Sequence, residues 1–308
     1  MGSGKPRIAI LMAVYEPRMD WLREQLLSLN AQTYPNLMLY VRDDCSPTVP
    51  YAEIEQCVRE CITRFPYVMA RNEKNEGSNL TFEQLTREAE GEYFAYCDQD
   101  DVWLPEKLEV LEQYLEADVA AQLVYSDLAV IDKNGTRLAN SIQELRPRTR
   151  YLQGTGLSEQ YFFRNSAAGC SMLIRTETAK KAVPFPKRTV CDQWLAIVAS
   201  LSGSVVWEKQ PLVEYRQHNH NQTGVLHGII DKSSYWKQKI EPLQERLAAY
   251  QKLTIPSEEL CAFVYARLQG DVGTIFRYRK FSPYEAIFEM IIHFCPDWLV
   301  KKCLRRFT

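Results

Sequence analysis

Apolar runs of strand length alternate with amphipathic segments of helix length through the N-terminal part of the chain. Continuous apolar residues predict buried strands at 8–14, 37–41, 67–70 and 93–97. Between them, apolar side chains recur every three or four residues, for example at 51–64, and this periodicity predicts helices. Alternating strands and helices are typical of a parallel sheet with right-handed crossovers. We therefore predict an α/β fold.

The pattern changes in the second half of the chain. Further strands are predicted at 123–128, 171–175, 205–207 and 212–215. Helical periodicity then dominates at 235–253, 257–269 and 283–294. We expect one α/β domain over residues 5–228 and a helical extension over residues 229–308. Residues 1–4, Met-Gly-Ser-Gly, resemble a remnant of an expression vector.

A cluster of carboxylates follows the predicted strand at 93–97, in the stretch Asp98-Gln99-Asp100-Asp101. Open α/β sheets hold their ligands beyond the carboxyl ends of the strands. Carboxylates this close together repel one another unless a cation lies among them, and oxygen ligands favour Mg²⁺ or Mn²⁺. The stretch therefore predicts a divalent-metal site that binds a diphosphate. The simpler alternative is a polar loop that caps the next helix.

A second acidic pair, Asp43-Asp44, follows the strand at 37–41. In a doubly wound sheet this pair would face the same crevice as the first cluster. Ordinary turn chemistry explains the pair equally well. Asp192 precedes the apolar helix at 195–201, where an acidic residue usually serves as a cap. Three of the four histidines fall between 218 and 227. This clustering makes a buried structural role a weaker explanation for them.

Composition excludes several classes of protein. Apolar residues make up 46% and charged residues 25%, which is typical of a soluble globular protein, and a net charge of −2 argues against a dedicated nucleic-acid-binding protein. The nine cysteines include no Cys-x-x-Cys pair, so we expect free thiols in a reducing cytoplasm. No signal-peptide pattern and no apolar stretch of the ~18 residues needed for a membrane span is found. We expect a cytoplasmic protein.

Six ordered motifs resemble the inverting family 2 glycosyltransferases, which have the GT-A fold. They are Ala13-Val14-Tyr15-Glu16, Asp43-Asp44-Cys45-Ser46, Asn75-Glu76-Gly77, Asp98-Gln99-Asp100-Asp101, Cys191-Asp192-Gln193-Trp194 and Tyr215-Arg216-Gln217-His218. Each motif is weak alone, and the resemblance, over residues 7–224, rests on their order. The stretch 102–108 after the Asp-x-Asp motif is also similar to bacterial rhamnosyltransferases, which build O-antigens and other cell-surface polysaccharides.

The resemblance implies a doubly wound, mainly parallel GT-A sheet flanked by helices, with a helical C-terminal extension. It also implies roles for single residues. Asp192 would be the catalytic base. Asp98, Asp100 and His218 would hold Mn²⁺ or Mg²⁺. The nucleotide-binding residues would be Ala13, Tyr15, Glu16, Asp43, Asp44, Asn75, Gly77, Asp98 and Arg216.

Within the nucleotide pocket, Asp44 or its neighbour Asp43 would accept the N3–H of a uracil or thymine ring, because a carboxylate is an acceptor facing a fixed donor. Two positions depart from the usual pattern. Cys45 occupies a place where many relatives have glycine, and Cys191 precedes the base where many relatives have glutamate. Neither change removes a functional carboxylate.

The implied reaction moves rhamnose or a hexose from dTDP-rhamnose or a UDP-hexose to a hydroxyl of a growing glycan. A divalent ion would stabilise charge on the departing diphosphate, and a carboxylate on the opposite face of the sugar would accept the hydroxyl proton. Alternatives are a sugar nucleotidyltransferase and an inactive sugar-binding relative. The first usually has a glycine-rich loop where this chain has Tyr15-Glu16-Pro17-Arg18, and the second predicts a decayed Asp-x-Asp motif.

The C-terminal end leaves two interpretations open. An apolar stripe on the predicted helix at 283–294 precedes the basic residues Lys301, Lys302, Arg305 and Arg306. A basic, aromatic and amphipathic end can lie on an anionic membrane surface. This would fit a lipid-linked acceptor at the inner face of the membrane, reached by peripheral contact. The simpler interpretation is a core-facing helix with a solvated tail.

Overall fold

The computed structural model describes residues 4–218 and 229–304, which form two compact units. Unit 1 comprises Met1–Ser158 and Asn165–His218, and unit 2 comprises Glu159–Arg164 and Asn219–Thr308. The predicted domain boundary at 228 and residues 1–3 of the predicted vector remnant lie outside the described residues. Both therefore stay predictions.

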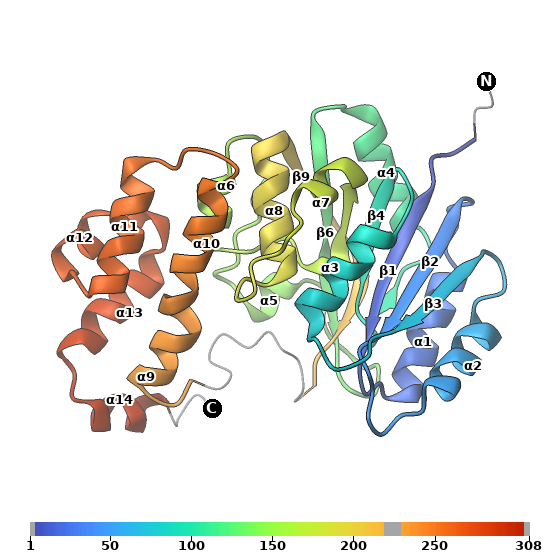
Figure 1. The fold of residues 1–308 in the computed structure, drawn as a ribbon, viewed down its shortest axis with the longest axis horizontal. Helices are drawn as coiled ribbons and strands as arrows, with labels where there is room; N and C mark the ends of the chain where they lie inside the picture. Colours follow the sequence, from blue (N-terminus) through green and yellow to red (C-terminus); the bar gives the residue numbers. More distant parts are fainter. Residues whose placement is uncertain (1–3, 219–228, 305–308) are drawn as a thin grey trace. The chain divides into compact units, whose positions relative to one another are not determined.

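Unit 1 is built on a mixed sheet, whose described strands follow the order β3-β2-β1-β4-β8-β6-β9-β5, with β7 paired to β6 (Figure 1). The strands are β1 Ile8–Val14, β2 Leu37–Asp43, β3 Tyr67–Arg71, β4 Tyr93–Cys97, β5 Val102–Trp103, β6 Ala121–Ile131, β7 Arg137–Ala139, β8 Met172–Arg175 and β9 Ser204–Arg216. The four strands from β3 to β4 pair in parallel, as the alternating pattern predicted. Strands β5 and β8 run antiparallel to their neighbours.

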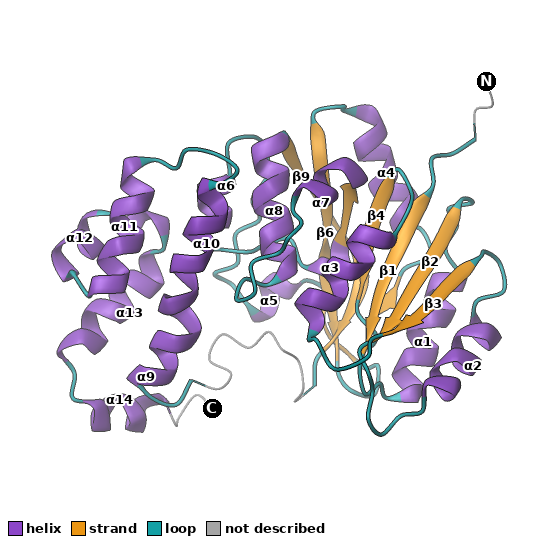
Figure 2. Ribbon diagram, in the orientation of Figure 1, coloured by secondary structure: helices purple, strands orange, loops and turns teal. Residues whose placement is uncertain are grey.

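Helices cover both faces of this sheet. Side chains on both faces of its strands are therefore buried, which explains why the strand sequences are continuously apolar. The helices that begin in unit 1 are α1 Met19–Asn30, α2 Tyr51–Cys61, α3 Ser78–Glu88, α4 Lys107–Ala117, α5 Ile142–Leu145, α6 Ser158–Tyr161, α7 Thr176–Lys181 and α8 Cys191–Ser202. Alternate β1 residues, Ile8, Ile10 and Met12, share a core with α1, α2 and α4. Figure 2 shows α3 in front of the sheet and α1 and α2 behind it.

Most predicted elements are present in the structure, and one prediction needs correction. Strands β1 and β4 have the predicted bounds. The two strands predicted at 205–207 and 212–215 are one strand, β9, whose register against β6 shifts around Asp127. Helix α3 begins at Ser78 with Gly77 as its N-cap. Gly77 has φ +84°, a left-handed conformation that only glycine adopts without strain.

Unit 2 is helical, as the periodicity predicted. Its helices after the undescribed segment are α9 Lys232–Tyr235, α10 Glu241–Gln251, α11 Glu258–Gln269, α12 Val272–Arg277, α13 Pro283–Phe294 and α14 Asp297–Leu304. A π-helical turn, Trp236–Ile240, joins α9 to α10. No helix within the described parts of the chain combines the length and apolar character needed to cross a membrane.

Candidate active site

The carboxylate of Asp44, just beyond β2, organises the loop that precedes α3. Its Oδ1 accepts hydrogen bonds from Asn72 Nδ2 (2.7 Å) and Glu76 N (2.8 Å), and its Oδ2 accepts one from Gly77 N (2.8 Å). Asn75 is exposed, and its side chain accepts a further bond from Gly77 N at 3.0 Å. Of the predicted residues, Gly77 is therefore joined to Asp44 through its backbone N–H, and the Asn75 side chain contacts the same N–H.

Asp43 and Glu16 both support loops. Asp43 is fully buried, accepts hydrogen bonds from Ser46 N (3.1 Å) and Ser46 Oγ (2.6 Å), and pairs with Arg71 Nε at 3.1 Å. Glu16 accepts bonds from the backbone N–H (2.7 Å) and hydroxyl of Thr48, while its own N–H donates to Ser46 Oγ (2.9 Å). The two carboxylates thus hold the turns after β1 and β2 against each other.

Tyr15 lies at the end of β1 with 42% of its surface exposed, and Ala13 is partly buried on the same strand. The backbone of Tyr15 makes two reciprocal hydrogen bonds with one side chain of the acidic loop. Its N–H donates to Gln99 Oε1 (2.9 Å), and its carbonyl accepts from Gln99 Nε2 (3.0 Å). Gln99 therefore fastens the acidic loop after β4 to the end of β1.

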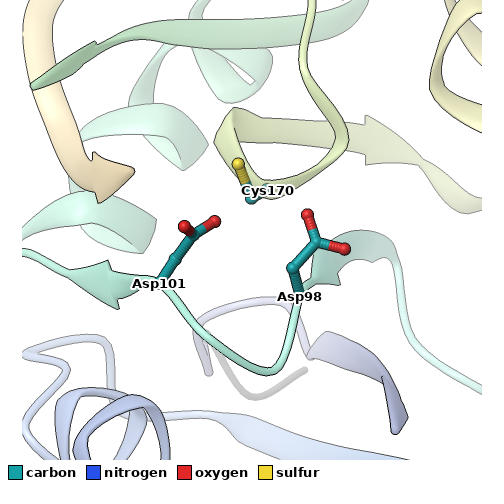
Figure 3. A group of neighbouring side chains, drawn as sticks. All are labelled: Asp98, Asp101 and Cys170. Carbon is teal, nitrogen blue, oxygen red and sulfur yellow. The ribbon is translucent and has the colours of Figure 1, made fainter. Parts of the chain in front are cut away.

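The acidic loop turns two carboxylates toward a cysteine from a distant segment. Asp98 and Asp101 face Cys170 across a small space (Figure 3). One ligand atom from each residue lies within 4.8 Å of the other two. Asp101 Oδ1 accepts a hydrogen bond from Arg216 N (2.9 Å), and the Cys170 thiol is a further hydrogen-bond partner of the same carboxylate. This group of a thiol and two carboxylates is a candidate metal site.

Titration of this site is shifted by its burial. Desolvation, with the negative charges of Asp101, Asp100 and Asp192 nearby, raises the pKa of Asp98 well above its usual value. Burial raises the pKa of Asp101 to about 7. The same burial lowers the pKa of Lys107 to about 7, and this lysine donates to the Cys170 carbonyl oxygen at 2.6 Å. Negative charge in this site is therefore costly unless a cation offsets it.

Asp100 points to a different partner from Asp98. Its Oδ2 lies 2.7 Å from Nε2 of His218, whose ring packs on Trp21 with 4.8 Å between ring centroids. The sequence predicted that Asp98, Asp100 and His218 hold one ion together. The structure pairs Asp100 with His218 and brings Asp98 to Asp101 and Cys170.

Arg216, at the end of β9, is 1% exposed. Its guanidinium donates to the carbonyl oxygen of Asp100 (2.8 Å), to the carbonyl oxygen of Asp132 (3.4 Å) and to the Glu24 carboxylate. Its backbone N–H donates to Asp101 as described above. Arg216 thus holds the acidic loop in place through its backbone and its side chain.

Asp192 lies in the first turn of α8, and the 3-10 turn Gly169–Ser171 donates a hydrogen bond to it. Its Oδ2 accepts a hydrogen bond from Gly169 N (3.2 Å), and its Oδ1 accepts one from Gln193 N (2.6 Å). Gly169 and Cys170 are neighbours in one 3-10 turn, so this turn links Asp192 to the acidic cluster. Desolvation raises the pKa of Asp192 to about 6, against the lowering effect of these N–H donors.

Asn79 connects the start of α3 to the start of α8. Its Oδ1 accepts a hydrogen bond from Cys191 N (3.0 Å), and its Nδ2 donates to the carbonyl oxygen of Thr189 (2.6 Å). Asn79 therefore fixes the residue immediately before Asp192. The loop held by Asp44 and the helix that carries Asp192 are joined by one amide side chain.

Comparison with known proteins decides the family. The sequence profile described as Glycosyl transferase family 2 matches residues 9–177, which is more than half of the chain. The chain belongs to glycosyltransferase family 2. This membership confirms the resemblance drawn from the six ordered motifs.

Relatives of this family 2 glycosyltransferase include two bacterial proteins. The dTDP-rhamnosyl transferase RfbG of Shigella flexneri is 25% identical over 229 residues, covering 70% of this chain and 74% of that protein. The putative teichuronic acid biosynthesis glycosyltransferase TuaG of Bacillus subtilis is 25% identical over 247 residues, covering 79% and 92%. Among solved structures, S. aureus TarS 1–349 in complex with UDP-GlcNAc has a TM-score of 0.63 and 15% identity, covering 98% of this chain and 92% of that one. The fold is therefore GT-A, as predicted.

Four residues around the candidate active site of this glycosyltransferase were not singled out by the sequence. Gln99, Cys170, Asn79 and Lys107 act through contacts with segments far away in the chain. Of these four residues, only Lys107 could have been noticed from the local sequence pattern. Lys107 is fully buried in the first turn of α4, where a lysine normally reaches solvent.

Proposed function

We propose that this chain is an inverting glycosyltransferase that moves rhamnose or a hexose from a nucleotide diphosphate to a hydroxyl of a growing glycan in bacterial surface-polysaccharide synthesis. One observation carries the proposal. A desolvated carboxylate, Asp192, and the acidic cluster around Asp98 are attached to the same short turn, at Gly169 and Cys170. Direct displacement at a sugar carbon needs a proton acceptor and a stabiliser of the leaving group on opposite sides of one small site.

The donor class is supported by the relatives. RfbG is named a dTDP-rhamnosyl transferase, and TarS 1–349 was crystallised with UDP-GlcNAc. We propose dTDP-rhamnose or a UDP-hexose as donor. The base and ribose would be held by Asp44, with Asn75 and Gly77 beside it, and by Ala13 and the exposed ring of Tyr15. An exposed aromatic ring offers a face on which a base can stack.

Other predicted nucleotide residues would act through the loops they hold. The carboxylates of Glu16 and Asp43 and the guanidinium of Arg216 are engaged with neighbouring residues of the protein. We propose that Glu16 and Asp43 shape the nucleotide pocket by fixing the turns after β1 and β2. Arg216 would position Asp100 and Asp101 rather than contact the diphosphate through its guanidinium.

The residues fit a divalent cation, Mn²⁺ or Mg²⁺, because Asp98 and Asp101 lie in one acidic loop where desolvation and neighbouring carboxylates make negative charge costly unless a cation offsets it. Asp98, Asp100 and His218 would hold the ion. When bound, such an ion supplies Lewis-acid stabilisation of negative charge on the leaving diphosphate. The Asp100 carboxylate orients the His218 ring through its hydrogen bond to Nε2.

Asp192 would accept the proton of the acceptor hydroxyl as that oxygen attacks the sugar. The Gly169 and Gln193 N–H groups hold its two oxygens and so orient the carboxylate. A pKa of about 6 makes it a stronger base than an ordinary aspartate, yet leaves it ionised at neutral pH. General-base help of this kind typically contributes ~10²–10⁴-fold in rate.

A lipid-linked acceptor, reached by peripheral membrane contact from the cytoplasmic side, is supported by α13. Tyr284, Ile287 and Ile291 on this helix are exposed by 49%, 46% and 57%, while Phe288 and Ile292 pack against the core of unit 2. The predicted stripe is thus half buried and half exposed. Co-sedimentation with anionic vesicles, weakened by Ile291→Asp, tests this contact, and equal sedimentation of both proteins would exclude it.

A panel of nucleotide sugars tests the proposed reaction. The purified protein is screened by thermal shift with and without Mn²⁺, and donors that stabilise it are then incubated with hydroxyl acceptors. We expect stabilisation by one nucleotide class only in the presence of Mn²⁺, and a product whose anomeric configuration, measured by NMR, is opposite to that of the donor. Retention of configuration, or donor binding unaffected by chelator, would contradict the proposal.

A further inference from the structure

Lys107 is a buried charged side chain to which the proposed reaction assigns no role. It is the first residue of α4 and is fully buried, with its Nζ 2.9 Å from the centroid of the Trp103 ring. The same Nζ donates a hydrogen bond to the carbonyl oxygen of Cys170 at 2.6 Å. Burying a lysine is costly, whereas a hydrophobic residue of similar volume often fills such a place without loss of stability. A role in holding Cys170 explains the lysine better than packing does.

The turn that Lys107 holds is the one that contacts Asp192. Cys170 is the middle residue of the 3-10 turn Gly169–Ser171. The turn begins with Gly169, whose N–H donates to Asp192 Oδ2 at 3.2 Å. A Cβ on Gly169 would lie 3.6 Å from the Cβ of Asp192, so the backbone of the turn packs directly on this side chain. A shift of the turn would therefore displace the Asp192 carboxylate.

Lys107 ties this turn to a distant element. Within the segment itself, Ser171 N and Ser171 Oγ both donate to the Ala168 carbonyl oxygen, each at 2.9 Å. These bonds fix the shape of the turn. The bond from Lys107 joins residues 63 positions apart and anchors the turn to α4, beside the anchor that the Cys170 thiol makes to Asp101.

We propose that Lys107 is a positioning residue for Asp192, acting through the turn Gly169–Ser171 that it anchors to α4. The inference rests on the proposed function for the role of Asp192 as proton acceptor. A reacting group displaced by about 1 Å can cost ~10²-fold in rate, so loss of the anchor should slow the chemical step. Donor binding, which uses other groups, should be unaffected.

An electrostatic role for Lys107 would have a different consequence. Desolvation raises the pKa of Asp98 and of Asp101, and the positive charge of Lys107 acts in the opposite direction. If that charge were the contribution of Lys107, its loss would weaken binding of the donor diphosphate and its cation more than the rate of transfer. Measuring kcat and donor affinity in the same variant therefore separates the two roles.

Lys107→Met removes the hydrogen-bond donor and keeps an apolar stem. We expect kcat to fall about 10–100-fold, and calorimetric titration should give a donor Kd within about twofold of the wild type. Leu115→Ala is the control, because Leu115 is fully buried about two turns further along α4 and its truncation destabilises the helix without removing the bond to Cys170. Wild-type kcat in Lys107→Met, a donor affinity that falls as far as kcat, or an equal fall of kcat in Leu115→Ala would overturn the proposal.

A double-mutant cycle tests whether Lys107 acts through Asp192. Lys107→Met/Asp192→Asn should transfer sugar no more than about twofold more slowly than Asp192→Asn alone, because a base that is absent cannot be displaced. Losses that multiply would overturn the proposal. Where Lys107→Met does not fold, Lys107→Gln is taken through the same cycle with the same expected result.

The positioning role and the proposed function fail in distinguishable ways. Wild-type transfer by Asp192→Asn would contradict the proposed function, and with it the role given to Lys107. A slow Asp192→Asn beside a Lys107→Met variant of wild-type kcat would contradict the positioning role alone.

Discussion

Asp192 is the residue whose ionisation should control the rate. Its pKa is raised to about 6 by desolvation, and a general base works only when it is deprotonated. We therefore expect kcat/KM to be constant above the pKa and to fall about tenfold per pH unit below about pH 6. Initial rates at saturating Mn²⁺ and low donor concentration measure this, since metal occupancy then stays constant. A profile that is flat between about pH 5 and 7 would rule out this base.

Cys45 is a residue under backbone strain. It has φ +60°, the left-handed region that costs a side-chain-bearing residue roughly 1–2 kcal/mol. Glycine avoids this cost but loses more entropy on folding, so Cys45→Gly should stabilise the protein by about 0.5–1 kcal/mol. Urea unfolding with an unchanged m-value measures the change. Cys45→Ser, which keeps the strain, is the control, and a glycine variant no more stable than the serine variant would contradict the explanation.

At the scale of elements, two amide side chains hold two different parts of the candidate site. Asn79 fixes the start of α8 and hence Asp192, whereas Gln99 fixes the acidic loop to the end of β1. Asn79→Ala should lower kcat about tenfold or more with little change in donor KM, because the base is displaced. Gln99→Ala should raise donor KM about 3–10-fold with little change in kcat, because two hydrogen bonds near the nucleotide are lost. Steady-state kinetics that show the same parameter changed in both variants would contradict these roles.

The sequence predicts elements well where a local pattern ends sharply. Strand β1 was found with its correct bounds because a continuous apolar run stops at Tyr15-Glu16-Pro17. Strand β9 was divided in two because Glu208-Lys209-Gln210-Pro211 breaks the apolar pattern. In the structure this stretch lies where the β6–β9 register shifts, which lets polar residues and a proline stay within one strand.

The candidate site was predictable only in part, for a physical reason. Carboxylates at strand ends, such as Asp44 and Asp98, can be placed from local sequence because the sheet brings strand ends together. Their partners come from elsewhere in the chain. Cys170 reaches Asp98 through a turn between two other elements, and Arg216 engages Asp100 from the end of the last strand. Such pairings depend on tertiary packing, which no local pattern records.

At the scale of the whole molecule, a buried ion pair joins helices α11 and α13 of unit 2. Arg267 Nη2 lies 2.5 Å from Glu289 Oε1, both side chains are less than a tenth exposed, and Tyr235 donates to the same oxygen at 2.7 Å. Removing one partner leaves the other charge buried, so Glu289→Ala should cost about 3–5 kcal/mol, and the double change Arg267→Met/Glu289→Leu should cost much less.

Amide hydrogen exchange measures where that loss of stability falls. Both members of the pair lie in unit 2, so helices α11 and α13 should lose protection while β1 and β4 of unit 1 keep theirs. An equal loss of protection in both units, or a double variant as unstable as the single one, would contradict the assignment.

The central claim is that one carboxylate accepts the proton while a separate set of groups binds the donor. Calorimetric titration of Asp192→Asn with its nucleotide-sugar donor and Mn²⁺, run beside a transfer assay, tests this claim most directly. We predict a donor Kd within about twofold of the wild type and a transfer rate lower by ~10²–10⁴-fold. Wild-type transfer by the variant, or an equal loss of donor affinity and transfer, would contradict it.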